Sequence, residues 1–226
     1  MTGLPLPSSR AGNRFPGFDA LAQRDHWDEV TRSLVQSRLS LLPQMRFFNV
    51  TEEACATALF DQLLDQRKEP RVPVTAMVDA RLAEKQTDGW HYDSMPEDAV
   101  AWRQSLAALD EDASAAYGTC FADCSWTDQE SMLAHIQDIG EQPWHDLTAS
   151  QVWGLWARYA CTAFYSHPWA WNEIGFAGPA YPRGYKNLGI DRLEPFEVAD
   201  ANPADDPTKT ADDHGTSSEA GTSHEH

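Results

Sequence analysis

The spacing of the apolar residues most constrains the fold of this chain, because it follows the period of an α-helix almost throughout. Three expected helices open with a capping box, in which Ser or Thr precedes Glu or Gln by three residues, at Ser94, Thr127 and Thr148. Two of them close at Gly118 and Gly140. Six helices are predicted: Asp19–Ser37, Thr51 to about Gln66, Val74–Lys85, Ser94 to Gly118, Thr127 to Gly140, and Thr148 to about Tyr165. No strand or hairpin signal accompanies them, so the predicted fold class is an all-α bundle.

The last predicted helix is apolar around much of its circumference, with Val152, Trp156, Tyr159 and Phe164 on several faces. A helix that is apolar on most sides is surrounded by other elements. We therefore expect this helix to be the central one.

Charge excludes one class of function. The 226 residues carry 35 acidic and 17 basic side chains, a formal net charge of −18, and no local cluster of Lys or Arg. Nucleic-acid binding is therefore not expected. No apolar run is long enough to cross a bilayer, and no secretory or twin-arginine signal opens the sequence. The expected location is the cytoplasm, or the periplasm if a signal-bearing partner exports the chain.

Composition also suggests the domain organisation. After Val198 the chain is acidic and polar without large apolar residues, which is typical of disorder. We predict an N-terminal arm over 1–18, a helical domain over 19–198 and a disordered acidic tail over 199–226.

Motifs for cofactors, metals and catalysis are missing from the sequence. It contains no glycine-rich nucleotide loop, no nucleophile elbow, no zinc-protease motif and no haem-attachment motif. Glu130 and His135 stand five residues apart, which does not fit the Glu-x-x-His pairs of di-metal bundles, and His135 is interpreted as an edge histidine. The cysteines Cys55, Cys120, Cys124 and Cys161 are expected to be reduced. No catalytic residue, cofactor site or metal site is predicted in this chain.

The segment Ser166–Gly189, SHPWAWNEIGFAGPAYPRGYKNLG, combines large rings with Gly and Pro. Such a composition suits neither a helix nor a strand, and Trp, Tyr and Arg dominate binding hot spots. We predict an ordered loop whose rings are buried by a second polypeptide. The predicted partner interface comprises His167, Trp169, Trp171, Asn172, Glu173, Phe176, Pro179, Tyr181, Arg183, Tyr185 and Lys186.

Several segments together resemble the gluconate 2-dehydrogenase subunit 3 family. They are RFFNVTEEACATALFDQLLDQ, LDEDASAAYGTCFADCSWTDQESMLAHI, the helix ending CTAFYSHP, and HPWAWNEIGFAGPAYPRGYKNLG, within Arg46–Gly189. The most specific part is a helix ending in Phe-Tyr, a His-Pro turn, then Asn-Glu-Ile-Gly-Phe and Gly-Pro.

The resemblance implies a small accessory subunit that binds and stabilises a large flavoprotein of the glucose-methanol-choline type and assists its folding or flavin uptake. The partner would carry FAD and oxidise a sugar or polyol, with an electron-accepting subunit as a further partner. Many relatives begin with a twin-arginine signal, which is missing here. The resemblance transfers no catalytic residue.

Two other hypotheses remain open from the residues. One is a free-standing enzyme that uses His167 and Glu173 as acid and base in a pocket walled by Trp169, Trp171 and Tyr181. The other is a helical adaptor without a dehydrogenase partner.

Overall fold

The computed structural model describes residues 14–39, 44–69, 71–187, 189–190 and 192–204 of the chain. Two compact units are distinguished. The helical unit is formed by residues 40–167, and the terminal unit by residues 1–39 together with 168–226. Apart from two strands of two residues each, the regular structure of the described residues is helical, so the predicted all-α class is confirmed.

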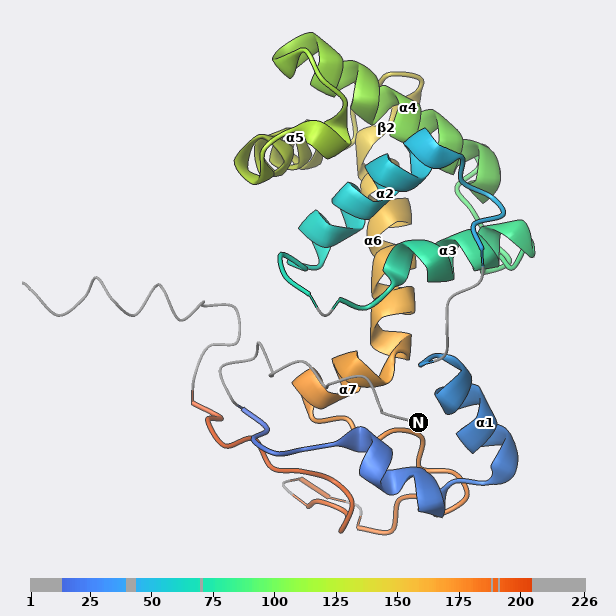
Figure 1. Ribbon diagram of the computed structural model, residues 1–226, viewed down its shortest axis with the longest axis vertical. Helices are drawn as coiled ribbons and strands as arrows, with labels where there is room; N and C mark the ends of the chain where they lie inside the picture. Colours follow the sequence, from blue (N-terminus) through green and yellow to red (C-terminus); the bar gives the residue numbers. More distant parts are fainter. Residues whose placement is uncertain (1–13, 40–43, 70, 188, 191, 205–226) are drawn as a thin grey trace, which may run out of the picture. The chain divides into compact units, whose positions relative to one another are not determined.

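The helical unit contains most of the regular structure (Figure 1). Its elements are α2 (Val50–Leu63), α3 (Val74–Ala83), α4 (Asp98–Tyr117), the short 3₁₀ helix η2 (Phe121–Asp123), α5 (Trp126–Ile139), β1 (Pro143–Trp144), β2 (Leu147–Thr148) and α6 (Ala149–Ser166). Helix α6 contacts α2, α3, α4 and α5, which confirms its central position.

Aromatic side chains of α2, α4 and α6 fill the core of this unit. The Trp102 ring lies 5.4 Å from Phe60 and 5.7 Å from Tyr159, measured between ring centroids. Trp156 is fully buried, and its indole N–H donates to the Ser105 hydroxyl over 3.0 Å. Large rings bury much apolar surface, and a buried indole N–H usually requires an acceptor.

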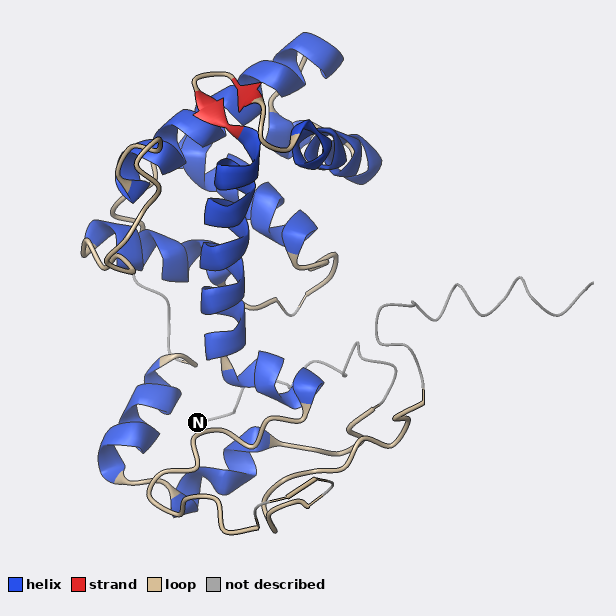
Figure 2. Ribbon diagram, turned by 180° about the vertical axis from the view of Figure 1, so that it is seen from behind, coloured by secondary structure: helices blue, strands red, loops and turns tan. Residues whose placement is uncertain are grey.

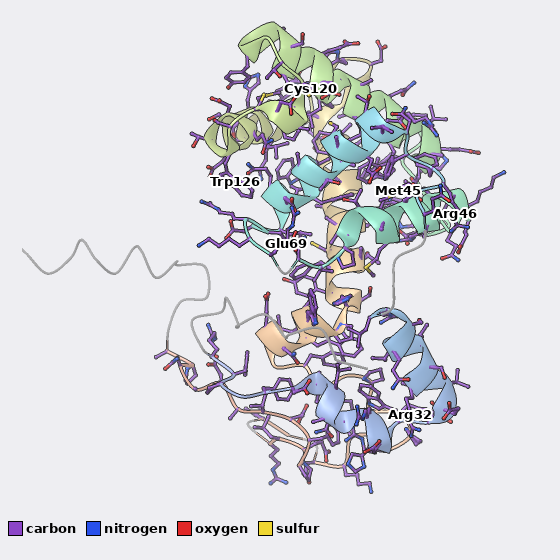
Figure 3. The ribbon with its side chains drawn as sticks, viewed as in Figure 1. Arg32, Met45, Arg46, Glu69, Cys120 and Trp126 are labelled. Atoms are coloured by element: carbon purple, nitrogen blue, oxygen red, sulfur yellow. The ribbon has the colours of Figure 1, made fainter. Side chains whose placement is uncertain are left out.

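A buried carboxylate fixes the segment that leads into α2. Asp79 on α3 is 1% exposed and accepts hydrogen bonds of 2.8 Å from the backbone N–H groups of Arg46, Phe47 and Phe48. Figure 3 shows Arg46 beside α3, where its guanidinium also donates to Glu84 over 2.7 Å. Phe48 packs against the buried Trp102, at 6.1 Å between ring centroids, so the segment that Asp79 binds is also packed against the core.

Three helices of this unit are capped at residues other than the predicted starts Thr51, Ser94 and Thr127. Asn49, not Thr51, caps α2 and forms a capping box with Glu52. Ser125, not Thr127, caps α5 by accepting from the Asp128 N–H. In both helices a suitable residue two positions upstream accepts the first free N–H groups, and the sequence pattern alone does not rank the two candidates.

The other two predicted boxes lack their capping bonds. The Ser94 hydroxyl donates to Gln151 over 2.8 Å, and α4 begins only after Glu97. Thr148 does occupy the N-cap of α6, but its side chain makes no capping hydrogen bond. The predicted ends at Gly118 and Gly140 are confirmed, since both glycines have positive φ.

The expectation that no strand exists is wrong for residues 143–148. Strands β1 and β2 pair antiparallel, with Pro143 opposite Thr148 and Trp144 opposite Leu147 (Figure 2). The turn requires a φ of +50° at His145, a conformation usually signalled by Gly or Asn. Its stability comes from Trp144, whose indole N–H donates to Asp112 over 2.7 Å and whose ring lies 5.6 Å from that of Trp156.

The terminal unit contains the 3₁₀ helix η1 (Ala20–His26), α1 (Glu29–Ser37) and α7 (Pro168–Ile174). The predicted helix Asp19–Ser37 is therefore interrupted. The first piece ends at His26 with Trp27 as its C-cap. Asp28 caps the second piece, since its carboxylate accepts from the Thr31 N–H over 2.8 Å. The unit has a small core of Ala20, Trp27, Val35 and Trp171, with Phe18 and Leu21 packed against it.

The predicted irregular segment contains α7, so the expectation that it excludes a helix is wrong for residues 168–174. Pro168 occupies the first turn, where the missing N–H costs no hydrogen bond. The helix stops before Gly175, which has a φ of +69°. The chain from Gly175 to the last described residue, 204, forms no further helix or strand at the described positions.

The first described residue, Arg14, contacts the segment near position 200 within the terminal unit. The Arg14 guanidinium donates to the Asp200 carboxylate over 2.7 Å, and the Ala201 N–H donates to the Arg14 carbonyl over 2.8 Å. The hydrogen bond from Arg14 lowers the pKa of Asp200. Residues 1–13 of the expected arm and 205–226 of the expected tail lie outside the described residues, and the domain boundaries stay a prediction.

Candidate functional site

The predicted interface residues fall into a buried and an exposed group. On α7, Trp171 is 3% exposed and meets Trp27 edge-on at 6.4 Å between centroids. Asn172 is also buried, and its side-chain oxygen accepts from the Ala20 N–H over 2.7 Å. These two side chains therefore hold the terminal unit together, and the expectation that the Trp171 ring needs a second polypeptide for burial is wrong.

His167 and Trp169 are also buried, and Glu173 is half-buried. The Trp169 ring, like that of Trp171, is therefore not an exposed surface of this chain. A ring with almost no accessible area cannot line an open pocket, so the structure does not form the expected pocket walled by Trp169, Trp171 and Tyr181.

The exposed group follows α7. Phe176 is 39% exposed, Tyr181 is 64% exposed and Tyr185 is 52% exposed. Ile174, Ile190 and Leu193, which the interface prediction omitted, are exposed as well. We call these six side chains the 174–193 surface. A segment that exposes several rings and aliphatic side chains is a candidate for binding another protein.

Polar contacts within the terminal unit order this surface. Glu194 is buried, and its carboxylate accepts from the backbone N–H groups of Lys186 and Asn187. Arg183 donates to Gln23 over 2.8 Å, and its guanidinium lies 3.9 Å from the centroid of Phe196.

Arg183, predicted as an interface residue, thus acts as an intramolecular anchor, while Lys186 is exposed and Pro179 is half-buried. Glu194 was missed, because nothing in its sequence neighbourhood distinguishes it from a solvent-exposed carboxylate.

A second constellation, in the helical unit, was not predicted from the sequence. Asp88, in the loop after α3, binds both Arg81 of α3 and Arg158 of α6. Arg158 also lies 3.6 Å from the Asp98 carboxylate, which accepts from the Tyr159 hydroxyl over 2.6 Å. We call these five residues the Asp88 cluster.

Protonation states in the cluster follow from these contacts. Burial alone would raise the pKa of Asp88, but hydrogen bonds and charges from Arg81 and Arg158 outweigh it and lower the pKa. Burial, and then the hydrogen bond to Asp98, raise the pKa of Tyr159. Asp88 is therefore a carboxylate and Tyr159 a neutral phenol at neutral pH.

The described residues offer no metal site. No group of three or more His, Cys, Asp and Glu side chains among them is arranged to hold an ion. Cys55, Cys120, Cys124 and Cys161 form no disulfide with one another in the structure. Burial, followed by the nearby Asp110, raises the pKa of the Cys55 thiol, which makes it a poor nucleophile.

His135 is exposed on α5, in agreement with its interpretation as an edge histidine. The helices that the structure describes include none long and apolar enough to cross a membrane.

The described residues form a mostly helical protein that exposes several aromatic side chains after α7. A protein-family model described as gluconate 2-dehydrogenase subunit 3 matches residues 50–178, which is more than half of the chain. The chain belongs to this family, which is named for a subunit of a dehydrogenase complex. No curated protein matches the sequence and no solved structure matches the fold.

Proposed function

We propose that this chain is the non-catalytic small subunit of a heteromeric, FAD-dependent sugar or polyol dehydrogenase. In this assembly the chain binds and stabilises a large flavoprotein of the glucose-methanol-choline type and assists its maturation. FAD and the oxidation of the substrate belong to the partner.

One observation carries the proposal beyond family membership. The 174–193 surface exposes Phe176, Tyr181 and Tyr185 on a segment that Glu194 and Arg183 hold in place. Exposed rings on an ordered segment can bind with a small loss of conformational freedom, because much of the ordering has already occurred in the free chain. The buried side chains of Trp171 and Asn172 support this surface from within the terminal unit and do not belong to it.

The experiment is purification of the tagged chain from its native host. We expect a large flavoprotein to copurify in stoichiometric amount and to give the complex a visible flavin spectrum. Dehydrogenase activity with sugars or polyols should accompany the complex and not the isolated small chain.

A variant of the 174–193 surface tests directly whether its exposed rings bind the partner. Tyr181→Ser with Tyr185→Ser should reduce the recovered flavoprotein at least tenfold, since aromatic anchors dominate interface energies. Tyr117→Ser, which removes a comparably exposed ring at the end of α4, is the matched control and should leave recovery unchanged. Recovery of a partner without flavin would favour the adaptor hypothesis, and turnover by the isolated small chain would favour the enzyme hypothesis.

A further inference from the structure

The loop between α3 and α4, residues 84–97, exposes two aromatic rings. Trp90 is 53% exposed and Tyr92 is 47% exposed, and their centroids lie 5.5 Å apart in an edge-on arrangement. Neither ring takes part in the 174–193 surface. Exposure of a Trp and a Tyr in direct contact with each other is unusual for a surface that only faces water.

The Asp88 cluster holds this loop in a defined position. Asp88 connects the loop to α3 through Arg81 and to α6 through Arg158. The Arg158 guanidinium also lies 5.0 Å from the centroid of Trp90, which is within the range of a cation–π interaction. Trp90 is therefore presented to solvent by a loop that two helices fix, and not by a free segment.

A hollow lies beside the Trp90 ring. It has a volume of about 360 Å³, and its lining includes Leu82, Gln86, Trp90, His91, Glu97 and Ala99. Leu82 and Ala99 give it an apolar part, whereas Gln86, His91 and Glu97 offer hydrogen-bonding groups. A hollow of this size next to an exposed indole can receive a side chain from another protein.

The charges around the loop indicate the chemistry of the partner. Asp88 and Asp98 are balanced by Arg81 and Arg158. The exposed charged side chains that remain from 85 to 97 are Lys85, Asp93 and Glu97, so carboxylates outnumber ammonium groups. The whole chain carries a formal net charge of −18. A complementary surface has an apolar or aromatic centre and a rim of Lys or Arg.

We infer that the 84–97 loop is a second docking surface for the flavoprotein subunit, with Trp90 and Tyr92 as anchors and Asp88 as the residue that positions them. This inference rests on the proposed function. The flavoprotein contributes a basic-rimmed apolar patch, from which one side chain enters the hollow beside Trp90.

The test is the affinity of the purified small chain for the purified flavoprotein. Trp90→Ser with Tyr92→Ser should raise Kd roughly 30-fold, the loss expected for two interface anchors. Tyr117→Ser is the control and should leave Kd within about twofold. Circular dichroism of each variant checks that the helical unit is folded.

Two charge variants extend the test without touching the rings. Asp93→Lys should lower the association rate several-fold at low salt, and the difference from wild type should shrink as salt rises. Asp88→Asn should increase Kd and speed hydrogen exchange of the backbone amides of residues 86–92. Asp65→Asn, which changes a carboxylate paired with Arg67, is its matched control and should do neither.

The outcomes separate the inference from the proposed function. If the wild-type chain binds the flavoprotein and neither the ring variant nor Asp93→Lys weakens binding, the 84–97 loop is not a docking surface and the proposed function stands. If Tyr181→Ser with Tyr185→Ser weakens binding and the loop variants do not, the 174–193 surface alone forms the interface. If the wild-type chain binds no flavoprotein, both ideas fail.

Discussion

Replacing Asp79 by Ala should destabilise the helical unit more than any surface substitution. The Asp79 carboxylate is buried and accepts from three consecutive backbone N–H groups, those of Arg46, Phe47 and Phe48. Alanine offers no acceptor, so these donors lose their partner at the point where the chain enters α2. Phe48, which packs against Trp102, loses its anchor at the same time.

The magnitude follows from the three bonds. The bond from Phe48 is buried and those from Arg46 and Phe47 are partly buried. A buried donor left without a partner costs about 1–3 kcal/mol and a partly buried one less, so the total is about 3 kcal/mol. Asp79→Asn should cost less, about 2 kcal/mol, because Oδ1 can still accept from Phe47 and Phe48 while the new amide group faces the Arg46 N–H. Asp138→Asn, at an exposed position on α5, should stay within about 0.5 kcal/mol of wild type.

Urea unfolding followed by far-UV circular dichroism measures these differences, with the unfolding midpoint compared among the three variants. Hydrogen exchange provides a local readout, since the amides of residues 46–48 should lose protection in Asp79→Ala before the rest of α2 does. A loss of less than 1 kcal/mol in Asp79→Ala, with those amides still protected, would refute the reasoning.

Three further predictions concern single positions. Asn49→Ala should cost about 1 kcal/mol in thermal unfolding while Thr51→Ala costs less than about 0.5, because only Asn49 caps α2; equal costs would contradict the observed cap. Gly178→Ala should destabilise the terminal unit by roughly 2–4 kcal/mol, because φ is +78° and the new Cβ would lie 2.5 Å from the Trp27 ring. The measurement is the rate of proteolysis after residue 167, which should rise; an unchanged rate would contradict the prediction. Folding lowers the pKa of Asp88, so the stabilisation by this carboxylate is complete above its unfolded pKa of about 3.9. The stabilisation is lost as the pH falls through the lower folded pKa. If the wild type lost stability relative to Asp88→Asn between pH 6 and pH 8, the direction of this pKa shift would be contradicted.

Helical spacing predicted the elements of the helical unit well, because each amphipathic stripe depends on residues three and four apart. The central position of α6 was predicted for the same reason, since Val152, Trp156 and Tyr159 leave it few polar faces. The first residues of the helices were predicted less accurately than the last ones. A glycine such as Gly118 ends a helix by its own conformation, whereas neighbouring candidates for a cap, such as Asn49 and Thr51, compete through three-dimensional geometry.

The candidate surfaces were predicted only in part. The exposed rings Phe176, Tyr181 and Tyr185 lie where their composition suggested, after the last helix. The Asp88 cluster was not predictable, because Asp88 and Arg158 are 70 positions apart and neither stands in a recognisable motif. The significance of Trp90 and Tyr92 depends on that cluster, so these rings were missed as well.

The sequence by itself determined the helical class, the family and the presence of more large rings than one small core requires, since these follow from local spacing and composition. Only the tertiary structure decided which rings the chain buries for itself. Trp171 is buried because α7 packs against the segment near residue 20, where the Ala20 N–H donates to Asn172, 152 positions away in the sequence. Tyr181 and Trp90 are exposed because no distant segment among the described residues covers them, and local sequence contains no information about contacts at that separation.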